Sequence, residues 1–464
     1  MGIRTARINA LLQNPEIGSE VTVSGWVRTR RGNKNVQFIA LNDGSCLEHL
    51  QVVAETGRFP HPLLQAVTTG ACVRVSGTLV ASPGAGQSVE LQATTLQVLG
   101  AADPAAYPLQ KKGHSLEFLR TIAHLRPRTN TFGAVLRIRH QLSQAIHRFF
   151  SDNGFVWLHT PIITASDCEG AGAMFRVTTL DPSQPPRRDD DTVDFSADFF
   201  GQQTSLTVSG QLEGELGALA LGLVYTFGPT FRAENSNTAR HLAEFWMVEP
   251  EMAFYDLDDT MQLAEQFLQS IIGQVLDRCV ADLDFLAEHY QPTLPDTLRA
   301  IVSEPFARIS YTEAIAILDC AEKAFEFPAE WGCDLQAEHE RYLVENHFGR
   351  PVIVYDYPRD IKAFYMKQNK GGQTVRALDI LFPHVGEIVG GSQREDDHDL
   401  LRQRISELQL PDEDLWWYLD TRRFGSAPHS GFGLGFDRLV QFVTGMANIR
   451  DVIPFPRTPQ NAAF

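Results

Sequence analysis

The stretch GPTFRAENSNTARHLAEFWMVEPEMAF, residues 228–254, decides the fold, because each of its ends has the pattern of a β-strand that carries charge. Successive side chains of a strand point to opposite faces, so Arg232 and Glu234 share one face. Phe245 and Glu249 likewise share a face of the second strand. Burying an unpaired charge costs several kcal/mol, so this sheet is either solvated or holds a ligand that satisfies the charges. A solvated antiparallel face is the more common explanation of the stretch taken alone.

The segment HSGFGLGFDRLV, residues 429–440, combines three glycines with the start of the final helix, which we expect to begin near Phe436. Its glycines allow the backbone to lie close to another group, and Arg438 projects from the first helical turn. The pattern is not a dinucleotide fingerprint, and no P-loop signature follows it. A Gly-rich turn without a ligand explains the segment equally well on its own.

Two carboxylates, Asp379 and Glu387, lie eight residues apart in RALDILFPHVGEIVGGSQRE, residues 376–395. Mg²⁺ takes one or two such ligands and leaves its other positions to phosphate and water. The pair is therefore compatible with a metal shared with phosphates, although a solvated pair of acids is the simpler explanation of the segment alone.

Short alternating hydrophobic runs separated by turn residues fill residues 18–99. Five such strands in a segment of this length fit a small closed barrel such as the OB-fold. Pro104 and Pro108 then discourage regular structure. We therefore predict a barrel domain, a linker and a larger second domain, over residues 1–100, 101–130 and 131–464.

Hydrophobic periodicity, proline and glycine predict further elements. These are a helix over 133–153 capped by Gly154, a strand over 155–164 with Pro161 inside it, a helix over 257–280 capped by Asp256, strands alternating irregularly with helices over 352–394, and a solvated loop over 182–191 within an insertion near 181–198.

Composition is that of an ordinary globular protein, with 43% hydrophobic and 21% charged residues among 464. No uninterrupted apolar run approaches the ~18 residues of a membrane span, and the N-terminus lacks a signal peptide's hydrophobic stretch, so we expect a cytoplasmic protein without membrane contact. The six cysteines show no metal-site spacing and are expected to be reduced thiols. A net charge of −17 argues against nonspecific coating of nucleic acid but permits a local basic face.

Together these segments resemble the class II aminoacyl-tRNA synthetases. F-R-A-E resembles the second motif of that class, G-F-G-L-G-F-D-R the third, and the helix leading to Pro161 the first. The barrel segments GWVRTRR and FIALNDGS are typical of the subgroup for aspartate, asparagine and lysine. Further segments are similar to the bacterial asparaginyl-tRNA synthetases from end to end: TVSGQLEGE at 207–215, DIKAFYM at 360–366, VGEIVGGSQRE at 385–395 and DVIPFPRTP at 451–459.

The resemblance implies an α+β fold, in which an N-terminal OB-fold β-barrel precedes a class II catalytic domain built on an antiparallel sheet flanked by helices. It also implies that L-asparagine attacks the α-phosphorus of ATP, releases pyrophosphate, and is then transferred to the 3′ end of tRNA-Asn. Mg²⁺ would be held by Asp379 and Glu387, whose spacing is one residue longer than in the aspartyl pattern.

The resemblance also assigns the nucleotide contacts. Arg232 would grip the α-phosphate and Arg438 the γ-phosphate, because an arginine fork donates in pairs and stays charged. Phe245 would stack on adenine, Glu234 would contact the nucleotide, and His241 would approach the distal phosphates. Arg232, Glu234 and Arg438 form the expected catalytic set.

Asparagine differs from aspartate by a donor NH₂ group, and reading that group needs an acceptor. Glu249 stands where the aspartyl enzymes carry an aspartate, and it would accept from the NH₂ and repel a substrate carboxylate. Arg394 would hold the carboxamide oxygen, and Gln211 would contact the ammonium group. Gly214 stands where the aspartyl pattern has a lysine.

In the barrel, the resemblance assigns the anticodon to Arg31, Phe38, Gln51 and Glu90, with local positive charge from Arg28, Arg30 and Lys34. Aromatic stacking on a splayed base and hydrogen bonds to base edges would read the sequence. The first motif implies a homodimer.

Three alternatives stay open from the sequence. One is an aspartate-specific or nondiscriminating enzyme. An ammonia-dependent asparagine synthetase of the same catalytic fold is disfavoured because it lacks the barrel. A noncatalytic tRNA-binding paralogue is disfavoured because such proteins usually lose the ATP arginines, which are retained here.

Overall fold

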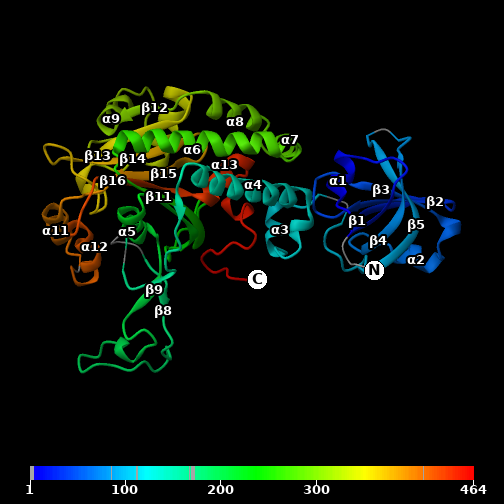
Figure 1. Ribbon diagram of the computed structural model, residues 1–464, viewed down its shortest axis with the longest axis horizontal. Helices are drawn as coiled ribbons and strands as arrows, with labels where there is room; N and C mark the ends of the chain where they lie inside the picture. The colour runs from blue at the N-terminus through cyan, green and yellow to red at the C-terminus, as the bar shows by residue number, and fades with distance from the viewer. Residues whose placement is uncertain are drawn as a thin grey trace. The chain divides into compact units, whose positions relative to one another are not determined.

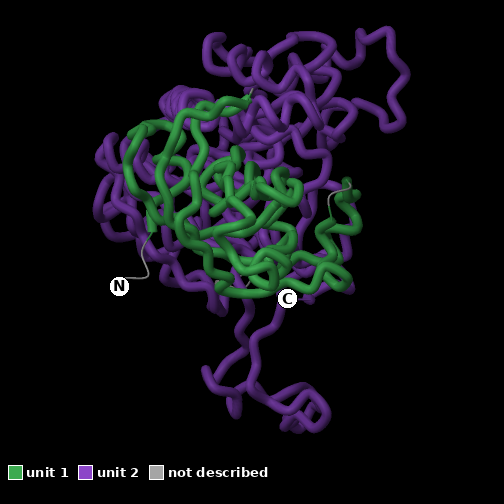
Figure 2. Tube along the Cα trace, turned by 90° about the vertical axis from the view of Figure 1, so that its right-hand side faces the viewer, with its two compact units in different colours: residues 1–137, 464 green, residues 138–463 purple. Residues whose placement is uncertain are grey.

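The computed structural model describes residues 5–84, 86–110, 113–166, 168, 173–410 and 412–463. The chain forms two compact units that divide after Arg137 (Figure 2). Residues 111 and 112 of the predicted linker lie outside the described residues.

The first unit contains the predicted five-stranded closed barrel, which is confirmed, with strands in the order β1-β2-β3-β5-β4. Its interior is filled by alternate aliphatic side chains of the strands, such as Ile39, Leu41 and Val52, which are fully buried. Strands and helices of this unit are β1 (Glu20–Gly32), β2 (Val36–Asn42), β3 (Leu50–Glu55), β4 (Cys72–Ala81), β5 (Val89–Gly100), α1 (Ile8–Gln13), α2 (His61–Ala66) and α3 (Leu116–Thr121).

The second unit is built on an eight-stranded sheet (Figure 1). Its six central strands pair antiparallel, and β12 and β6 add one parallel neighbour at each edge. The strands, in their order across the sheet, are β12 (Ala307–Ser310), β13 (Val352–Pro358), β14 (Thr374–Phe382), β15 (Gly386–Gln393), β16 (His429–Gly435), β11 (Glu244–Ala253), β10 (Leu223–Phe231) and β6 (Val156–Trp157).

Helix α6 (Leu257–Arg278) runs across one face of this sheet, against β14, β15 and β16 (Figure 1). Asp256 begins the helix with a capping box, as predicted, and the helix ends two residues earlier than expected. On β16 the fully buried side chains of Phe432 and Leu434 alternate with glycines. The ring centre of Phe432 lies 6.0 Å from that of Phe267 on α6. The glycines therefore line the opposite face, which is the face of the candidate site.

Other helices surround the sheet. They are α4 (Asn130–Asp152), α5 (Gln211–Leu221), α7 (Val280–His289), α8 (Leu294–Ser303), α9 (Tyr311–Asp319), α10 (Ala337–Arg341), α11 (His398–Glu407), α12 (Trp416–Arg423) and α13 (Phe436–Thr444). The predicted starts of α4 and α13 agree with the structure to within three residues.

Three local predictions were wrong. No single strand contains Pro161, because β6 ends at Trp157 and a separate strand, β7 (Ile163–Thr164), follows the proline. Residues 352–394, all described, contain strands and a 3₁₀ turn but no α-helix, because apolar side chains on both faces of β14 and β15 are buried within the sheet. Strand β10 ends at Phe231, so Arg232 and Glu234 lie in the loop that follows it.

An arm built around β7, β8 (Arg176–Val177) and β9 (Thr204–Leu206) extends from the rest of the second unit (Figures 1 and 2). Its loop over 182–191 is largely exposed, as predicted. Asp198 fastens the arm by accepting hydrogen bonds from Thr178 and from the backbone and side chain of Thr179.

Candidate active site

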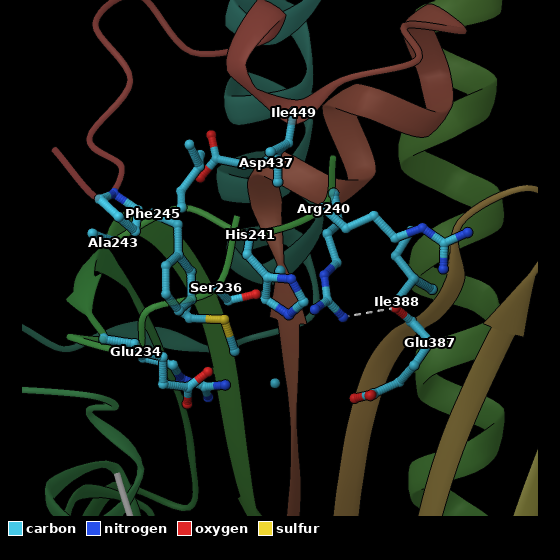
Figure 3. Close-up of a pocket in the computed structure, with 17 residues that line it drawn as sticks. Glu234, Ser236, Arg240, His241, Ala243, Phe245, Glu387, Ile388, Asp437 and Ile449 are labelled. Atoms are coloured by element: carbon cyan, nitrogen blue, oxygen red, sulfur yellow. Dashed lines mark hydrogen bonds between the residues drawn. The ribbon is translucent and has the colours of Figure 1, made fainter. Parts of the chain in front are cut away.

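All six predicted nucleotide contacts line one cavity on the open face of the sheet (Figure 3). Its volume is about 140 Å³. The six residues come from four places in the chain and are Arg232, Glu234, His241, Phe245, Glu387 and Arg438. The structure therefore brings together groups that are separated by as many as 206 residues in the sequence, from Arg232 to Arg438.

The hairpin between β10 and β11 holds the first part of this cavity. The backbone N–H of Arg232 donates to the carbonyl of Ala243 at 3.0 Å, which continues the ladder by one bond beyond the end of β10. The guanidinium of Arg232 lies 5.5 Å from the ring centre of Phe245. An aromatic face and a cation are thus held side by side, a suitable platform for a base and its phosphate.

The glycines of β16, of which Gly433 lines the cavity, leave room for side chains of the neighbouring strand β11. A Cβ at Gly433 would lie 2.9 Å from the Cε of Met247, and a Cβ at Gly431 would lie 2.3 Å from the carboxylate of Glu251. Any larger residue would therefore collide with the side chains of the neighbouring strand. The glycines of 429–440 serve close approach of strands at the site, which excludes the explanation of a turn without a role.

Arg438 projects from the first turn of α13, and its Nη1 donates to the carbonyl of Glu387 at 3.1 Å, the dashed line in Figure 3. His241 lies in the same cavity. Burial, together with the positive charge of Arg438, lowers the pKa of His241. A bound anion such as phosphate would place negative charge beside His241 and Arg438, and would therefore raise the pKa of His241 again.

A bulge brings the two predicted metal ligands onto one face. Pairing between β14 and β15 shifts after Ile380, so that Ile388 has no partner and Glu387 turns to the side of Asp379. A Cβ built on Gly390 would lie 3.1 Å from Glu387 Oε1 and 3.4 Å from Asp379 Oδ1, so the two carboxylates converge above this glycine. The extra residue in the Asp-to-Glu spacing is thus accommodated without separating the pair.

Two further charged groups adjoin this acidic pair. Lys362 donates to Asp379 Oδ2 at 2.8 Å. Burial, with the negative charges of Glu387 and Asp379, raises the pKa of Glu340 to about 7. Among the described residues, no group of three histidine, cysteine or acidic side chains has the geometry to hold a metal ion by itself. Two converging carboxylates, one of which lines the cavity, fit Mg²⁺, which leaves positions for phosphate and water.

Glu249 is held by three donors, two from the residues just before α5 and one from β10. Its Oε1 accepts from the hydroxyl of Ser209, and its Oε2 accepts from Gly210 N–H at 3.1 Å and from Thr226 Oγ1 at 2.8 Å. A carboxylate offers about four acceptor sites, so one on Oε1 remains. A Cβ on Gly214 would lie 3.3 Å from the Cγ of Glu251, so a lysine at this position would also crowd that side chain.

Arg394 and Gln211 belong to a buried polar cluster beside Glu249. The fork of Arg394 donates to both carboxylate oxygens of Glu251, and its Nη1 donates to Ser392 at 2.8 Å. These bonds use three of the five guanidinium N–H groups, and two remain for a ligand. Burial opposes the charged form, but Glu251 and Glu215 outweigh it and raise the pKa of Arg394.

Known proteins resemble this chain over its whole length. The family model for class II tRNA synthetases (D, K and N) matches residues 115–459, and the model for OB-fold nucleic acid binding domains matches residues 21–99. The asparagine–tRNA ligase of Cytophaga hutchinsonii is 61% identical, with 100% of both chains covered. That of Porphyromonas gingivalis is 60% identical, with 100% of this chain and 99% of the relative covered. This chain belongs to the asparaginyl-tRNA synthetase family of class II.

Solved structures of the asparaginyl-tRNA synthetase family superpose closely. The enzyme of Pyrococcus horikoshii complexed with asparaginyl-adenylate has a TM-score of 0.86 and 33% identity, with 99% of both chains covered. The enzyme of Entamoeba histolytica in complex with asparaginyl-adenylate has a TM-score of 0.83 and 26% identity, with 97% of this chain and 98% of the other covered. The α+β fold with an OB-fold barrel and a class II domain, as predicted, is confirmed.

Several residues of the candidate site in this member of the asparaginyl-tRNA synthetase family were not predicted from the sequence. Arg240 and Asp437 line the cavity, and Lys362 and Glu340 adjoin the acidic pair. Arg240 and Asp437 stand beside assigned residues in the sequence, and Lys362 lies within DIKAFYM. Glu340 gave no signal, because α10 is separated from β15 by more than forty residues.

The outer wall of the barrel carries the four predicted anticodon contacts. Arg31 pairs with Phe38 across β1 and β2, and Gln51 pairs with Glu90 across β3 and β5. Gln51 Nε2 donates to Glu90 Oε2 at 3.1 Å. These residues alternate with the core positions of the same strands, so all four side chains point to the outer face, and Glu90 is itself buried there, at 5% exposed.

The basic residues expected on this face are only partly there. Arg28 donates to Asn130 Oδ1 at 3.3 Å. Arg30 pairs with the core residue Ile39 and donates to the carbonyl of Leu64, so it points away from Phe38. The prediction that Arg30 adds charge to the face of Phe38 was therefore wrong, because strand alternation turns its side chain to the opposite face. Arg28 lies at a bulge between residues 27 and 29 and has no partner in the register, so its contribution to this face stays a prediction.

Proposed function

We infer that this chain is an asparagine–tRNA ligase. It activates L-asparagine with ATP, releases pyrophosphate, and transfers asparagine to the 3′ end of tRNA-Asn. The observation that carries this proposal is one cavity lined by three arginines, a histidine, an aromatic ring and three acids, in a chain 61% identical over its full length to an asparagine–tRNA ligase.

Catalysis rests on position and charge. The attacking group is the substrate's own carboxylate, which is already ionised, so no side-chain base is needed. Arg232 stabilises charge on the α-phosphate, and Arg438 binds the γ-phosphate of the leaving pyrophosphate. Phe245 stacks on adenine, Glu234 contacts the nucleotide, and His241 approaches the distal phosphates.

Asp379 and Glu387 hold Mg²⁺, which neutralises phosphate charge when it is bound. Their convergence above Gly390 supports this assignment. Lys362 lies on the far oxygen of Asp379 and fixes the orientation of that carboxylate. Arg438 contacts the backbone of Glu387 rather than its carboxylate, so phosphate and metal contacts do not compete for one side chain.

Amino-acid choice depends on Glu249. Its remaining acceptor site takes the NH₂ group of asparagine, and its charge repels the carboxylate of aspartate. The remaining N–H groups of Arg394 hold the carboxamide oxygen, and Gln211 contacts the ammonium group. A site that hydrogen-bonds its substrate in this way rejects the wrong analogue by roughly 10⁴- to 10⁵-fold.

Two further interactions complete the proposal. Arg31, Phe38, Gln51 and Glu90 read the anticodon of tRNA-Asn from the outer wall of the barrel. A second copy of the chain pairs at the edge strand β6, where Val156 and Trp157 are 46% and 56% exposed. No described helix is long and apolar enough to cross a membrane. We place the enzyme in the cytoplasm.

Exchange of pyrophosphate into ATP tests this function without tRNA. Asparagine should support exchange and aspartate should not. Exchange with aspartate alone would favour an aspartyl enzyme, exchange with both would favour a nondiscriminating one, and exchange with neither would favour a noncatalytic tRNA-binding paralogue.

A further inference from the structure

Gln211 can accept a hydrogen bond from an ammonium group only if the carbonyl end of its side-chain amide, and not the NH₂ end, faces the substrate. The residue begins α5 and is nearly buried, and its Nε2 donates to Glu215 Oε1 at 3.0 Å, one helical turn along. An ionised carboxylate has no hydrogen to donate, so it always selects the NH₂ end of the amide. The carbonyl Oε1 of Gln211 therefore faces away from Glu215.

Glu215 itself is fixed independently of any substrate. Its carboxylate is fully buried, and its Oε2 accepts from Tyr418 Oη at 2.7 Å and from Arg422 Nη2 at 2.6 Å. The Nε2 of His429 lies 3.0 Å from the same oxygen. Burial alone would raise the pKa of Glu215, but Arg422, His429 and Arg394 hold it well below its usual range. The carboxylate is therefore a permanent acceptor.

The same carboxylate also adjoins Arg394, whose Nε lies 3.8 Å from Glu215 Oε1. Glu215 thus touches two of the three residues assigned to asparagine, Gln211 and Arg394. It lies behind them, so that it acts on the substrate only through them.

We propose that Glu215 is a positioning residue for the amino acid: it orients the amide of Gln211 so that the carbonyl oxygen receives the substrate's ammonium group. This inference rests on the proposed function. The two donors at Oε2, Tyr418 Oη and Arg422 Nη2, make the change Glu215→Gln informative, because they would bind the carbonyl end of the new amide. Its NH₂ would then face Gln211 and would turn the NH₂ of Gln211 toward the ammonium group.

Asparagine-dependent pyrophosphate exchange tests the inference. With Glu215→Gln we expect the KM for asparagine to rise roughly 10- to 100-fold, the range of a lost hydrogen bond to a charged group, with kcat and the KM for ATP nearly unchanged. The exchanged pair Gln211→Glu with Glu215→Gln restores an acceptor at position 211 that faces the substrate. Its KM for asparagine should return to within about fivefold of the wild type.

A purely structural role predicts other results. A fall in kcat at unchanged KM for asparagine, or an exchanged pair that folds and keeps a KM more than about tenfold above the wild type, would overturn the inference. If Glu215→Gln alone does not fold, the double variant Gln211→Glu with Glu215→Gln decides between the two roles. It keeps the charge and the hydrogen-bonding groups of the two residues. Asp198→Asn is the control, because this carboxylate is also buried and hydrogen-bonded but lies in the arm. Absence of exchange in the wild type would instead refute the proposed function.

Discussion

Single residues of the site were predictable where a motif carried them. Arg232, Phe245 and Arg438 were assigned from short segments, and the structure places them in one cavity. Glu215 was part of a quoted segment, yet nothing in the sequence predicts its contacts with Tyr418 and Arg422, which lie about two hundred residues away. Contacts of that kind depend on the packing of α5 against α12 and are visible only in the fold.

Arg438→Ala should abolish adenylate formation. In the proposed function this side chain binds the phosphate that leaves, and loss of one such charged donor costs about 10²-fold or more in kcat/KM. Pyrophosphate exchange measures the loss, and filter binding should show that tRNA affinity is retained. The control Arg423→Ala removes an exposed arginine paired with Asp420 and should leave exchange unchanged. Equal exchange in both variants would remove Arg438 from the site.

Glu249→Gln should mainly alter amino-acid choice. The amide keeps the shape of the carboxylate but loses its charge and part of its acceptor capacity. We expect kcat/KM for asparagine to fall roughly 10- to 100-fold and that for aspartate to fall less. Exchange rates with the two amino acids give the ratio. A selectivity equal to that of the wild type would exclude Glu249 from discrimination.

At the scale of elements, barrel strands and long helices were predictable because their periodicity is strong. The irregular parts were not. The bulge that turns Glu387 toward Asp379 leaves no mark in hydrophobic periodicity, and the break of the strand at Pro161 depends on pairing with β10 and β9. The arm shows the same limit, because its three short strands are two or three residues long.

Asp256→Ala should destabilise the domain at the start of α6. The Asp256 side chain accepts a hydrogen bond from Asp259 N–H at 3.0 Å, and the Asp259 carboxylate accepts one from Asp256 N–H. The change to alanine therefore removes one of the two hydrogen bonds of the capping box. We expect a loss of about 1 kcal/mol in the free energy of unfolding. Denaturant titration measures it, and Asp258→Ala, in the same turn without a cap role, should cost less.

Phe38→Ala should weaken tRNA charging and spare pyrophosphate exchange. The ring lies on the outer wall of the barrel, and stacking on a base is worth about 1 to 3 kcal/mol. The KM for tRNA-Asn in aminoacylation should rise accordingly. Leu99→Ala, which removes an exposed apolar side chain from the same barrel, is the control. Equal damage to both reactions by Phe38→Ala would contradict this division of labour.

At the scale of the whole molecule, the order of two domains was predictable and their limits stay a prediction. The compact units divide after Arg137, inside α4, whereas the sequence placed a linker over 101–130. Because the division falls within a helix, neither a change in composition nor a turn residue marks it in the sequence. The homodimer implied by the first motif stays a prediction, and the exposed apolar side chains of β6 and β7 are where we expect a second copy to bind.

Trp157→Glu should convert a dimer to a monomer. A charge placed in a buried apolar contact is strongly unfavourable, so the dimer dissociation constant should rise by at least about 100-fold. Light scattering after gel filtration measures the mass. Trp416→Glu, at a more exposed tryptophan of α12, is the control. A wild-type protein that is already monomeric at micromolar concentration would contradict the dimer.

A crystal structure with a non-hydrolysable asparaginyl-adenylate analogue would show whether nucleotide and amino acid bind these residues together. We expect adenine on Phe245, the phosphate linkage beside Arg232, and the carboxamide NH₂ on Glu249 Oε1. An analogue bound elsewhere, or one whose carboxamide does not contact Glu249, would contradict this expectation.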